Sequence, residues 1–174
     1  MKTGFKFAMV AALVGTMFFT SCKKDSTTTN NSTPAVPGII SCKINGTAWS
    51  SPANVSQAML RNDTLGISGG QIANGDTSII SMNIVLTSTK TGKYSGSGSF
   101  LGGSKTLAFF IPSTKNSSAY FDIFMGSATY EINITKFDLT TNKVSGTFSF
   151  TQTRYSGTKD IVSEGTFTDI SIVQ

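Results

Sequence analysis

The stretch KVSGTFSFTQ, Lys143–Gln152, alternates between two kinds of side chain. One set is apolar or small: Val144, Gly146, Phe148 and Phe150. The other set carries hydroxyl groups: Ser145, Thr147, Ser149 and Thr151. Because successive side chains of a β-strand point to opposite faces, this period of two predicts a strand with one face in the core and one face in water.

The same period recurs along the chain after residue 38. In two segments the apolar residues stand at every second position: Ile80, Met82, Ile84 and Leu86 in the first, and Tyr130, Ile132 and Ile134 in the second. The dipeptide Asn-Gly at 45–46 and 74–75 predicts two tight hairpin turns, since both central residues of such a turn need positive φ. Phe167 is out of phase with Ile170 and Ile172, which predicts a β-bulge near Thr168 or Asp169.

These patterns decide the fold class. The chain has 174 residues, enough for one domain with a core, and only 13% of them are charged. No segment after residue 38 has a convincing helical period, and turn residues separate the apolar runs. We therefore expect residues 39–174 to form a single all-β domain. Its architecture is an antiparallel meander β-sandwich or a partly closed barrel of about eight to ten strands.

Residues 1–21 are organised like a secretory signal peptide. Lys2 and Lys6 precede the uncharged run FAMVAALVGTMFF, Phe7–Phe19. A membrane-spanning helix needs about 20 apolar residues, so this run of thirteen fits the shorter apolar region of a signal peptide. The segment 23–38 that follows is polar and contains two prolines, and we expect it to be a flexible spacer.

Cys22 lies at the junction of these two segments. The sequence FTSC, Phe19–Cys22, resembles the lipobox of bacterial lipoproteins, and SCKKD at 21–25 is similar to the lipoproteins of Bacteroidota. The resemblance implies cleavage before Cys22 and a lipid on its thiol, which anchors the spacer 22–38 to the outer membrane. Phe19 departs from the common pattern, which has Leu there. Surface-exported lipoproteins of this kind often carry several acids directly after the cysteine. KKDS, at 23–26, has only Asp25, and the resemblance therefore favours the periplasmic face over the cell surface.

The alternative for Cys22 is a disulfide with Cys42, the only other cysteine of the chain. In IISCKI, Ile39–Ile44, the alternation places Cys42 on one face with Ile40 and Ile44. A cysteine in that position is expected to be a small buried apolar residue, which favours the lipid on Cys22.

The domain itself also resembles a known family. The segments are KINGTAWSS (43–51), ITKFDLTTNKVSGTFSFTQ (134–152) and GTFTDI (165–170). They resemble Bacteroidota lipoproteins whose β-domain has unknown function. The resemblance implies a secreted, lipid-anchored domain and brings no catalytic residues. The short motifs DST and DTL resemble O-glycan acceptor sites of Bacteroidota, which implies glycosylation of Ser26 and Thr64.

Composition excludes several functions. The net charge is +5, but residues 39–174 hold ten basic and eight acidic residues, a net of +2, scattered singly, so we expect no nucleic-acid partner. The chain has no histidine, which removes the Ser–His–Asp and Cys–His arrangements and His-containing zinc sites. Gly98–Thr106 has one residue too many before its lysine for a phosphate-binding loop, and we expect a plain loop. No enzyme activity, cofactor or metal is expected.

Aromatic residues are the remaining candidates for a binding surface. Trp49, Tyr94 and Phe100 are the ones we select for ligand contact, and the other members of such a platform would be Tyr120, Tyr130 and Tyr155. Tyr94 and Phe100 flank a glycine-rich segment and are expected to be exposed, whereas Trp49 can equally close one end of the core. Core positions are expected for Phe109, Phe121, Phe148 and Phe150.

Four functions stay open on this basis. The leading one is a non-enzymatic binding or accessory module that contacts a glycan or an envelope protein. The second is a lipocalin-like carrier with a hollow interior, and the third is a purely structural envelope protein. The fourth is an enzyme with a pair of carboxylates, which requires two acids in one cleft.

Overall fold

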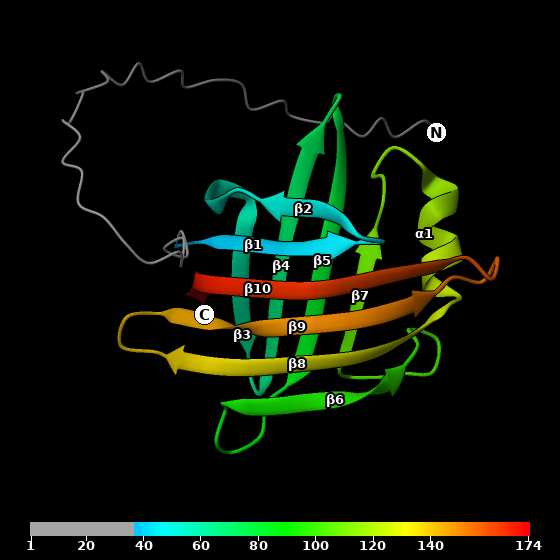
Figure 1. Cartoon of the computed structure of the whole chain (residues 1–174). Helices are drawn as coiled ribbons and strands as arrows, with labels where there is room; N and C mark the ends of the chain where they lie inside the picture. Colours follow the sequence, from blue (N-terminus) through cyan, green and yellow to red (C-terminus); the bar gives the residue numbers. More distant parts are fainter. Residues whose placement is uncertain (1–36) are drawn as a thin grey trace, which may run out of the picture. The chain divides into compact units, whose positions relative to one another are not determined.

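The computed structural model describes residues 37–174 and confirms the all-β class (Figure 1). Ten strands, one α-helix and a short 3-10 turn at Ala53–Val55 make up the described part. The strands are β1 (Ile39–Ile44), β2 (Thr47–Ser51), β3 (Ser56–Arg61), β4 (Thr64–Ala73), β5 (Asp76–Val85), β6 (Gly92–Gly98), β7 (Leu107–Ile111), β8 (Ser127–Asp138), β9 (Lys143–Thr153) and β10 (Lys159–Val173). The helix α1 spans Ser117–Phe124.

The strands form two layers that cross at a steep angle (Figure 1). The first layer has the order β6-β8-β9-β10-β1-β2, and the second has the order β3-β4-β5-β7. β10 joins them, because its last residues Ile172 and Val173 pair in parallel with Ala58 and Met59 of β3. This short parallel pairing is the exception in an otherwise antiparallel sheet, which is nearly closed into a barrel.

Both predicted Asn-Gly hairpins are confirmed. Asn45 and Gly46 have φ of 50° and 81° between β1 and β2, and Asn74 and Gly75 have φ of 52° and 72° between β4 and β5. Positive φ at both positions gives the turn a twist that matches the twist of the flanking strands.

β10 contains two bulges. The predicted one is confirmed, since the pairing with β9 shifts between Phe167 and Ile170, and Asp169 has φ of 46°. A second shift between Val162 and Gly165 contains Glu164, at φ of 53°. Each bulge resets which side chains face the core, so the fifteen residues of β10 keep one apolar face along a bent strand.

The helix α1 corrects the expectation that no helix follows residue 38. The Asn116 side chain accepts a hydrogen bond of 3.1 Å from the N–H of Ser118 and so caps the first turn. Only Ala119 and Ile123 are buried, which are four residues apart and lie on one side of the helix. Two buried positions are too few to produce a recognisable helical period in the sequence. None of the helices in residues 37–174 is long and apolar enough to cross a lipid bilayer.

Candidate functional site

Three segments converge at one end of the domain and expose apolar side chains there. They are the loop 99–106 between β6 and β7, the helix α1 with Met125, and the turn 154–158 between β9 and β10. Leu101, Tyr155 and Phe121 expose 70%, 69% and 59% of their surfaces, and Phe124 and Met125 are also exposed. We call this surface the aromatic end and define it by Phe100, Leu101, Phe121, Phe124, Met125 and Tyr155.

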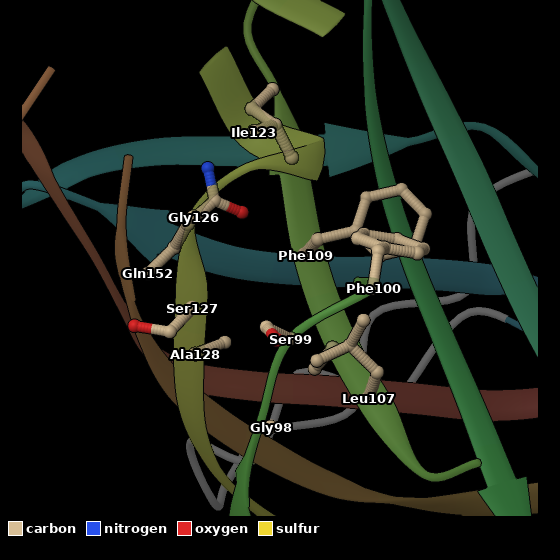
Figure 2. Close-up of a pocket in the computed structure, with 11 residues that line it drawn as sticks. Gly98, Ser99, Phe100, Leu107, Phe109, Ile123, Gly126, Ser127, Ala128 and Gln152 are labelled. Carbon is tan, nitrogen blue, oxygen red and sulfur yellow. The ribbon is translucent and has the colours of Figure 1, made fainter. Parts of the chain in front are cut away.

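Ring contacts connect the three segments. Phe100 of the loop packs edge-on against Phe124 of α1, with ring centroids 4.5 Å apart, and against Phe109 of β7 at 4.8 Å. Figure 2 shows the rings of Phe100 and Phe109 beside each other, with Ile123 of α1 nearby. Phe121 meets Tyr155 edge-on at 6.4 Å. These geometries are the favoured ones for aromatic pairs, so the rings hold the loop, helix and turn in one arrangement.

Asp122 ties α1 to the turn that carries Tyr155. Its carboxylate accepts hydrogen bonds from the N–H and the hydroxyl of Ser156, at 2.7 and 2.8 Å, and its main-chain carbonyl accepts from the N–H of Tyr155. The N–H of Ser156, followed by its hydroxyl and the charge of Arg154, lowers the pKa of Asp122 below the usual value. The carboxylate is therefore ionised at neutral pH and keeps Tyr155 beside Phe121.

A buried polar network supports the aromatic end from below. The side-chain amide of Gln152 in β9 accepts a hydrogen bond from the N–H of Phe110 and donates one to its carbonyl, at 2.9 and 3.0 Å. It thus takes the place of a neighbouring strand at the free edge of β7. Gln152 also donates to Asp160, which binds Arg154 through two hydrogen bonds of 2.7 and 2.8 Å. Within residues 37–174, no buried side-chain nitrogen or oxygen lacks a hydrogen-bond partner.

The cavity beneath the aromatic end is small. Its volume is about 10 Å³, and Phe100, Leu107, Ile123 and Gln152 are among its lining residues (Figure 2). This is room for about one water molecule and not for a larger ligand. A ligand or partner of this end must therefore bind on the outer surface.

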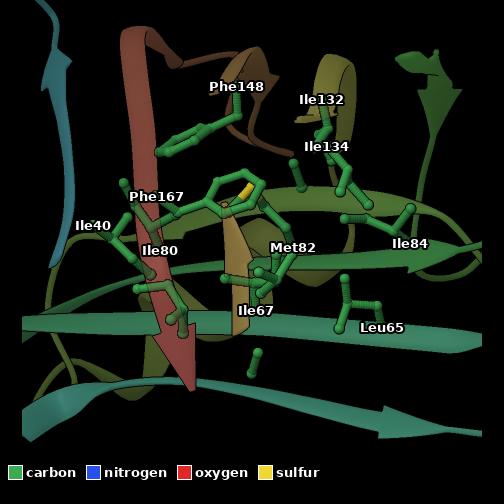
Figure 3. Packing of buried hydrophobic residues seen from close by; sticks show 14 of the residues in the cluster. Ile40, Leu65, Ile67, Ile80, Met82, Ile84, Ile132, Ile134, Phe148 and Phe167 are labelled. Atoms are coloured by element: carbon green, nitrogen blue, oxygen red, sulfur yellow. The ribbon is translucent and has the colours of Figure 1, made fainter. Parts of the chain in front are cut away.

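The core behind it is also filled (Figure 3). The side chains of Met82 and Phe167 lie between the two layers, and both residues are 1% exposed or less. The other fully buried apolar residues of the described part are Ile40, Ala58, Leu65, Ile67, Ile80, Ile84, Ala108, Ile132, Ile134, Val144, Val162 and Ile170. This packing counts against the hollow interior that the carrier alternative requires.

Two exposed lysines belong to the segments of the aromatic end. Lys105 lies in the same loop as Leu101, and Lys159 directly follows the turn that carries Tyr155. Within residues 37–174 no carboxylate lies within ion-pairing distance of either lysine. Lys115, which precedes the cap of α1, instead has its ammonium group beside Gly75 in the hairpin between β4 and β5. The aromatic end therefore has an apolar centre and two unpaired positive charges on neighbouring segments.

Two of the three aromatic residues selected from the sequence are in the core. Trp49 is 5% exposed, and its indole N–H donates a hydrogen bond of 2.8 Å to the Ser78 hydroxyl. The expectation that Tyr94 is exposed is wrong. Tyr94 is 9% exposed, because its ring lies on the inward face of β6. Its hydroxyl accepts a hydrogen bond from the N–H of Thr87. Phe100 is half-buried within the aromatic end.

The other aromatic expectations have mixed outcomes. Tyr155 belongs to the aromatic end, Tyr120 stacks on Phe124 beside it, and Tyr130 packs against the core. Phe121 was expected in the core, which is wrong, because it lies on the side of α1 away from Ala119 and Ile123.

The remaining predicted sites are placed as follows. Cys22 and Ser26 lie outside the described residues. Thr64 is half-buried at the start of β4, where it pairs with Arg61 and Val85. Gly98–Thr106 connects two strands and has no helix after it, as expected for a plain loop. Within residues 37–174, no three Cys, Asp or Glu side chains gather as a metal site would require.

Sequence reasoning did not select Leu101, Phe124 or Met125. Their signal is weak, because single apolar residues in loops are common on protein surfaces.

Comparison of the chain with protein-family models, curated proteins and solved structures finds no match.

Proposed function

We propose that the protein is a lipid-anchored lipoprotein of the outer membrane whose β-domain is a non-enzymatic binding module. The anchor rests on the N-terminal sequence: an uncharged run at 7–19, small residues before Cys22, and a polar spacer after it. Two or more acyl chains at one cysteine hold a protein on a membrane far more firmly than one chain.

The aromatic end is the observation that carries the binding role. An exposed apolar patch of several large side chains is unfavourable in water unless something covers it. The patch is also preorganised, because ring contacts and the Asp122–Ser156 hydrogen bonds fix its three segments before any partner arrives. Preorganised aromatic residues and methionine are typical of binding surfaces between proteins.

The partner that fits this surface is an envelope protein with an apolar centre and acidic residues around it. Lys105 and Lys159 have no acidic partner within residues 37–174, so carboxylates on the partner would complement them. A second copy of this chain would instead bring the same lysines together. Since like charges at an interface oppose association, we favour a different protein.

The position of Gly38, where the chain leads into β1, is compatible with this role. The N–H of Gly38 binds the carbonyl of Thr168, nine residues along β10 from Lys159. At about 3.3 Å per residue, Gly38 and the aromatic end are roughly 30 Å apart. A domain held from Gly38 can thus present the aromatic end away from the membrane that carries its lipid. We place it on the periplasmic face.

The alternatives give distinct expectations. A carrier needs a large apolar cavity, and the packing of Met82 and Phe167 between the layers counts against it. A purely structural protein would work without the aromatic end, so substitutions there would leave its associations unchanged.

Membrane fractionation with protease treatment tests the anchor and the face. The wild-type chain is expected in the outer-membrane fraction, and the Cys22→Ala chain in the soluble fraction. Protease should cut the wild-type domain only after cells are lysed. Equal membrane retention of Cys22→Ala would contradict the lipid anchor, and digestion in intact cells would place the domain on the surface.

Native gel electrophoresis of mildly solubilised cells tests the binding role. We expect the wild-type chain in a complex larger than one chain and the Phe121→Ser/Tyr155→Ser chain as a free protein. Val173→Ser is the matched control, because Val173 is 55% exposed and lies at the opposite end of β10 from Lys159. Identical mobility of all three chains would contradict a partner at the aromatic end.

A further inference from the structure

Both glutamates of the chain, Glu131 and Glu164, line one open groove on the outer face of the first layer. The groove has a volume of about 410 Å³, and the hydroxyls of Thr147, Ser149 and Thr166 belong to residues that line it. A neighbouring depression of about 390 Å³ shares Glu131 and Ser149 with it and adds Thr129, Thr151 and Ser163. We call the two together the polar groove. It lies on a different surface from the aromatic end.

Strand pairing sets the separation of the two glutamates. Glu131 of β8 pairs with Ser149 of β9. Ser149 lies between Phe148 and Phe150, which pair with Gly165 and Val162 of β10, so it faces the bulge that contains Glu164. The bulge leaves Glu164 exposed on the outer face between the buried Val162 and Gly165. Two strand spacings put the backbones of the glutamates about 10 Å apart.

Each glutamate is held by a lysine from the strand on its far side. Lys93 of β6 lies 2.9 Å from Oε1 of Glu131, and Lys43 of β1 lies 2.8 Å from Oε1 of Glu164. These pairs cancel the charge of the groove. Within residues 37–174 the Oε2 oxygens of both carboxylates make no hydrogen bond, so each is free to accept one from a ligand.

We infer that the polar groove binds a neutral oligosaccharide without cleaving it. Sugar hydroxyls can donate to the free carboxylate oxygens and accept from lysine, serine and threonine, and bonds to charged groups are the stronger ones. Cancelled charges favour a neutral ligand over an acidic one. This inference does not depend on the proposed partner of the aromatic end.

The surroundings of the glutamates argue against hydrolysis. A glycosidase needs one carboxyl that stays protonated, which an apolar and shielded site provides. Here the side chains of Glu131 and Glu164 are 53% and 66% exposed, and each is paired with a lysine. Neither glutamate therefore has the apolar, shielded surroundings that the acid of a glycosidase requires.

Titration calorimetry tests the groove. The full chain carrying Cys22→Ala is titrated with cellotetraose, maltotetraose and chitotetraose, and with tetragalacturonate as an acidic comparison. We expect saturable binding of at least one neutral tetrasaccharide, weakened at least tenfold by Glu131→Ala/Glu164→Ala. Lys136→Ala is the matched control, because it removes the exposed Lys136–Asp169 ion pair, whose residues do not line the groove.

Four results would overturn the inference. They are no binding of any neutral tetrasaccharide at millimolar concentration, unchanged affinity in the double glutamate variant, tighter binding of tetragalacturonate, and release of shorter sugars on incubation. Circular dichroism of each variant checks that it is folded, so that a loss of binding is assigned to the groove.

Discussion

The Asp122 carboxylate accepts hydrogen bonds from both the main-chain N–H and the hydroxyl of Ser156, 34 residues later in the chain. This relationship joins α1 to the turn between β9 and β10 and keeps Phe121 beside Tyr155. The aromatic end is therefore an assembled surface and not a set of independent exposed residues.

Removal of this carboxylate should loosen the turn selectively. In Asp122→Ala, the N–H of Ser156 loses its acceptor, so its hydrogen exchange should become faster while amides of β9 in the core keep their rates. Asp138→Ala is the control, since Asp138 accepts in the same way from Thr140 and Thr141 in another turn. Unchanged exchange at Ser156 would contradict the role of Asp122.

The stability of the domain should fall in acid but not near neutrality. Hydrogen bonds to the carboxylates lower the pKa of Asp76, Asp122, Asp138 and Asp169 below the usual value for Asp, about 3.9. A lowered folded-state pKa stabilises the fold above the unfolded pKa, and this contribution is lost as the pH falls through the folded value.

Urea unfolding at a series of pH values measures this dependence. The chain has no histidine, so we expect a constant free energy of unfolding from pH 5 to 8 and a decrease below about pH 4. A marked decrease between pH 8 and pH 5 would be the opposite of this expectation.

The Cys42 thiol should be unreactive in the folded protein. Cys42 is 6% exposed, and burial raises the pKa of its thiol to about 12, so very little reactive thiolate exists at pH 8. Ellman's reagent should detect no thiol in the native mature chain and one thiol per chain in guanidinium. No thiol in guanidinium would indicate the Cys22–Cys42 disulfide, and two thiols would indicate that Cys22 carries no lipid.

Gly146 of β9 is a position where a side chain does not fit. A Cβ there would overlap the carbonyl oxygen of Asn133 and the ring of Phe167. We expect Gly146→Ala to lower the free energy of unfolding by about 1–3 kcal/mol, the usual range for an overpacked core. Ser149→Ala on the outer face of the same strand is the control and should change it by less than about 0.5 kcal/mol.

Local patterns predicted the strands well. The alternation around Phe148 and Phe150 places both in the core, and the phase error at Phe167 corresponds to the bulge at Asp169. Both follow from the period of a strand, which a few neighbouring residues determine. In the segment Lys143–Gln152, the same alternation places Gln152 on the inward face. In the structure Gln152 is buried, and its side chain binds the free edge of β7.

The aromatic end was beyond local patterns. Leu101, Phe121 and Tyr155 come from three segments far apart in the sequence, and only the crossing of the two layers brings them together. The helix was also missed, since Ala119 and Ile123 are its only buried residues. Asn116, which accepts from the N–H of Ser118, was the available signal for its start.

Site-specific photocrosslinking in living cells tests the central claim most directly. A photoreactive phenylalanine analogue replaces Leu101 or Tyr155 at the aromatic end, or Val173 at the opposite end as the control. The account predicts an adduct with one distinct envelope protein from Leu101 and Tyr155 and none from Val173. Lys105→Glu/Lys159→Glu should weaken this adduct severalfold, because the partner is expected to have an acidic rim. Equal adducts from all three positions, adducts only with lipid or with a second copy of the chain, or an adduct unaffected by charge reversal would contradict it.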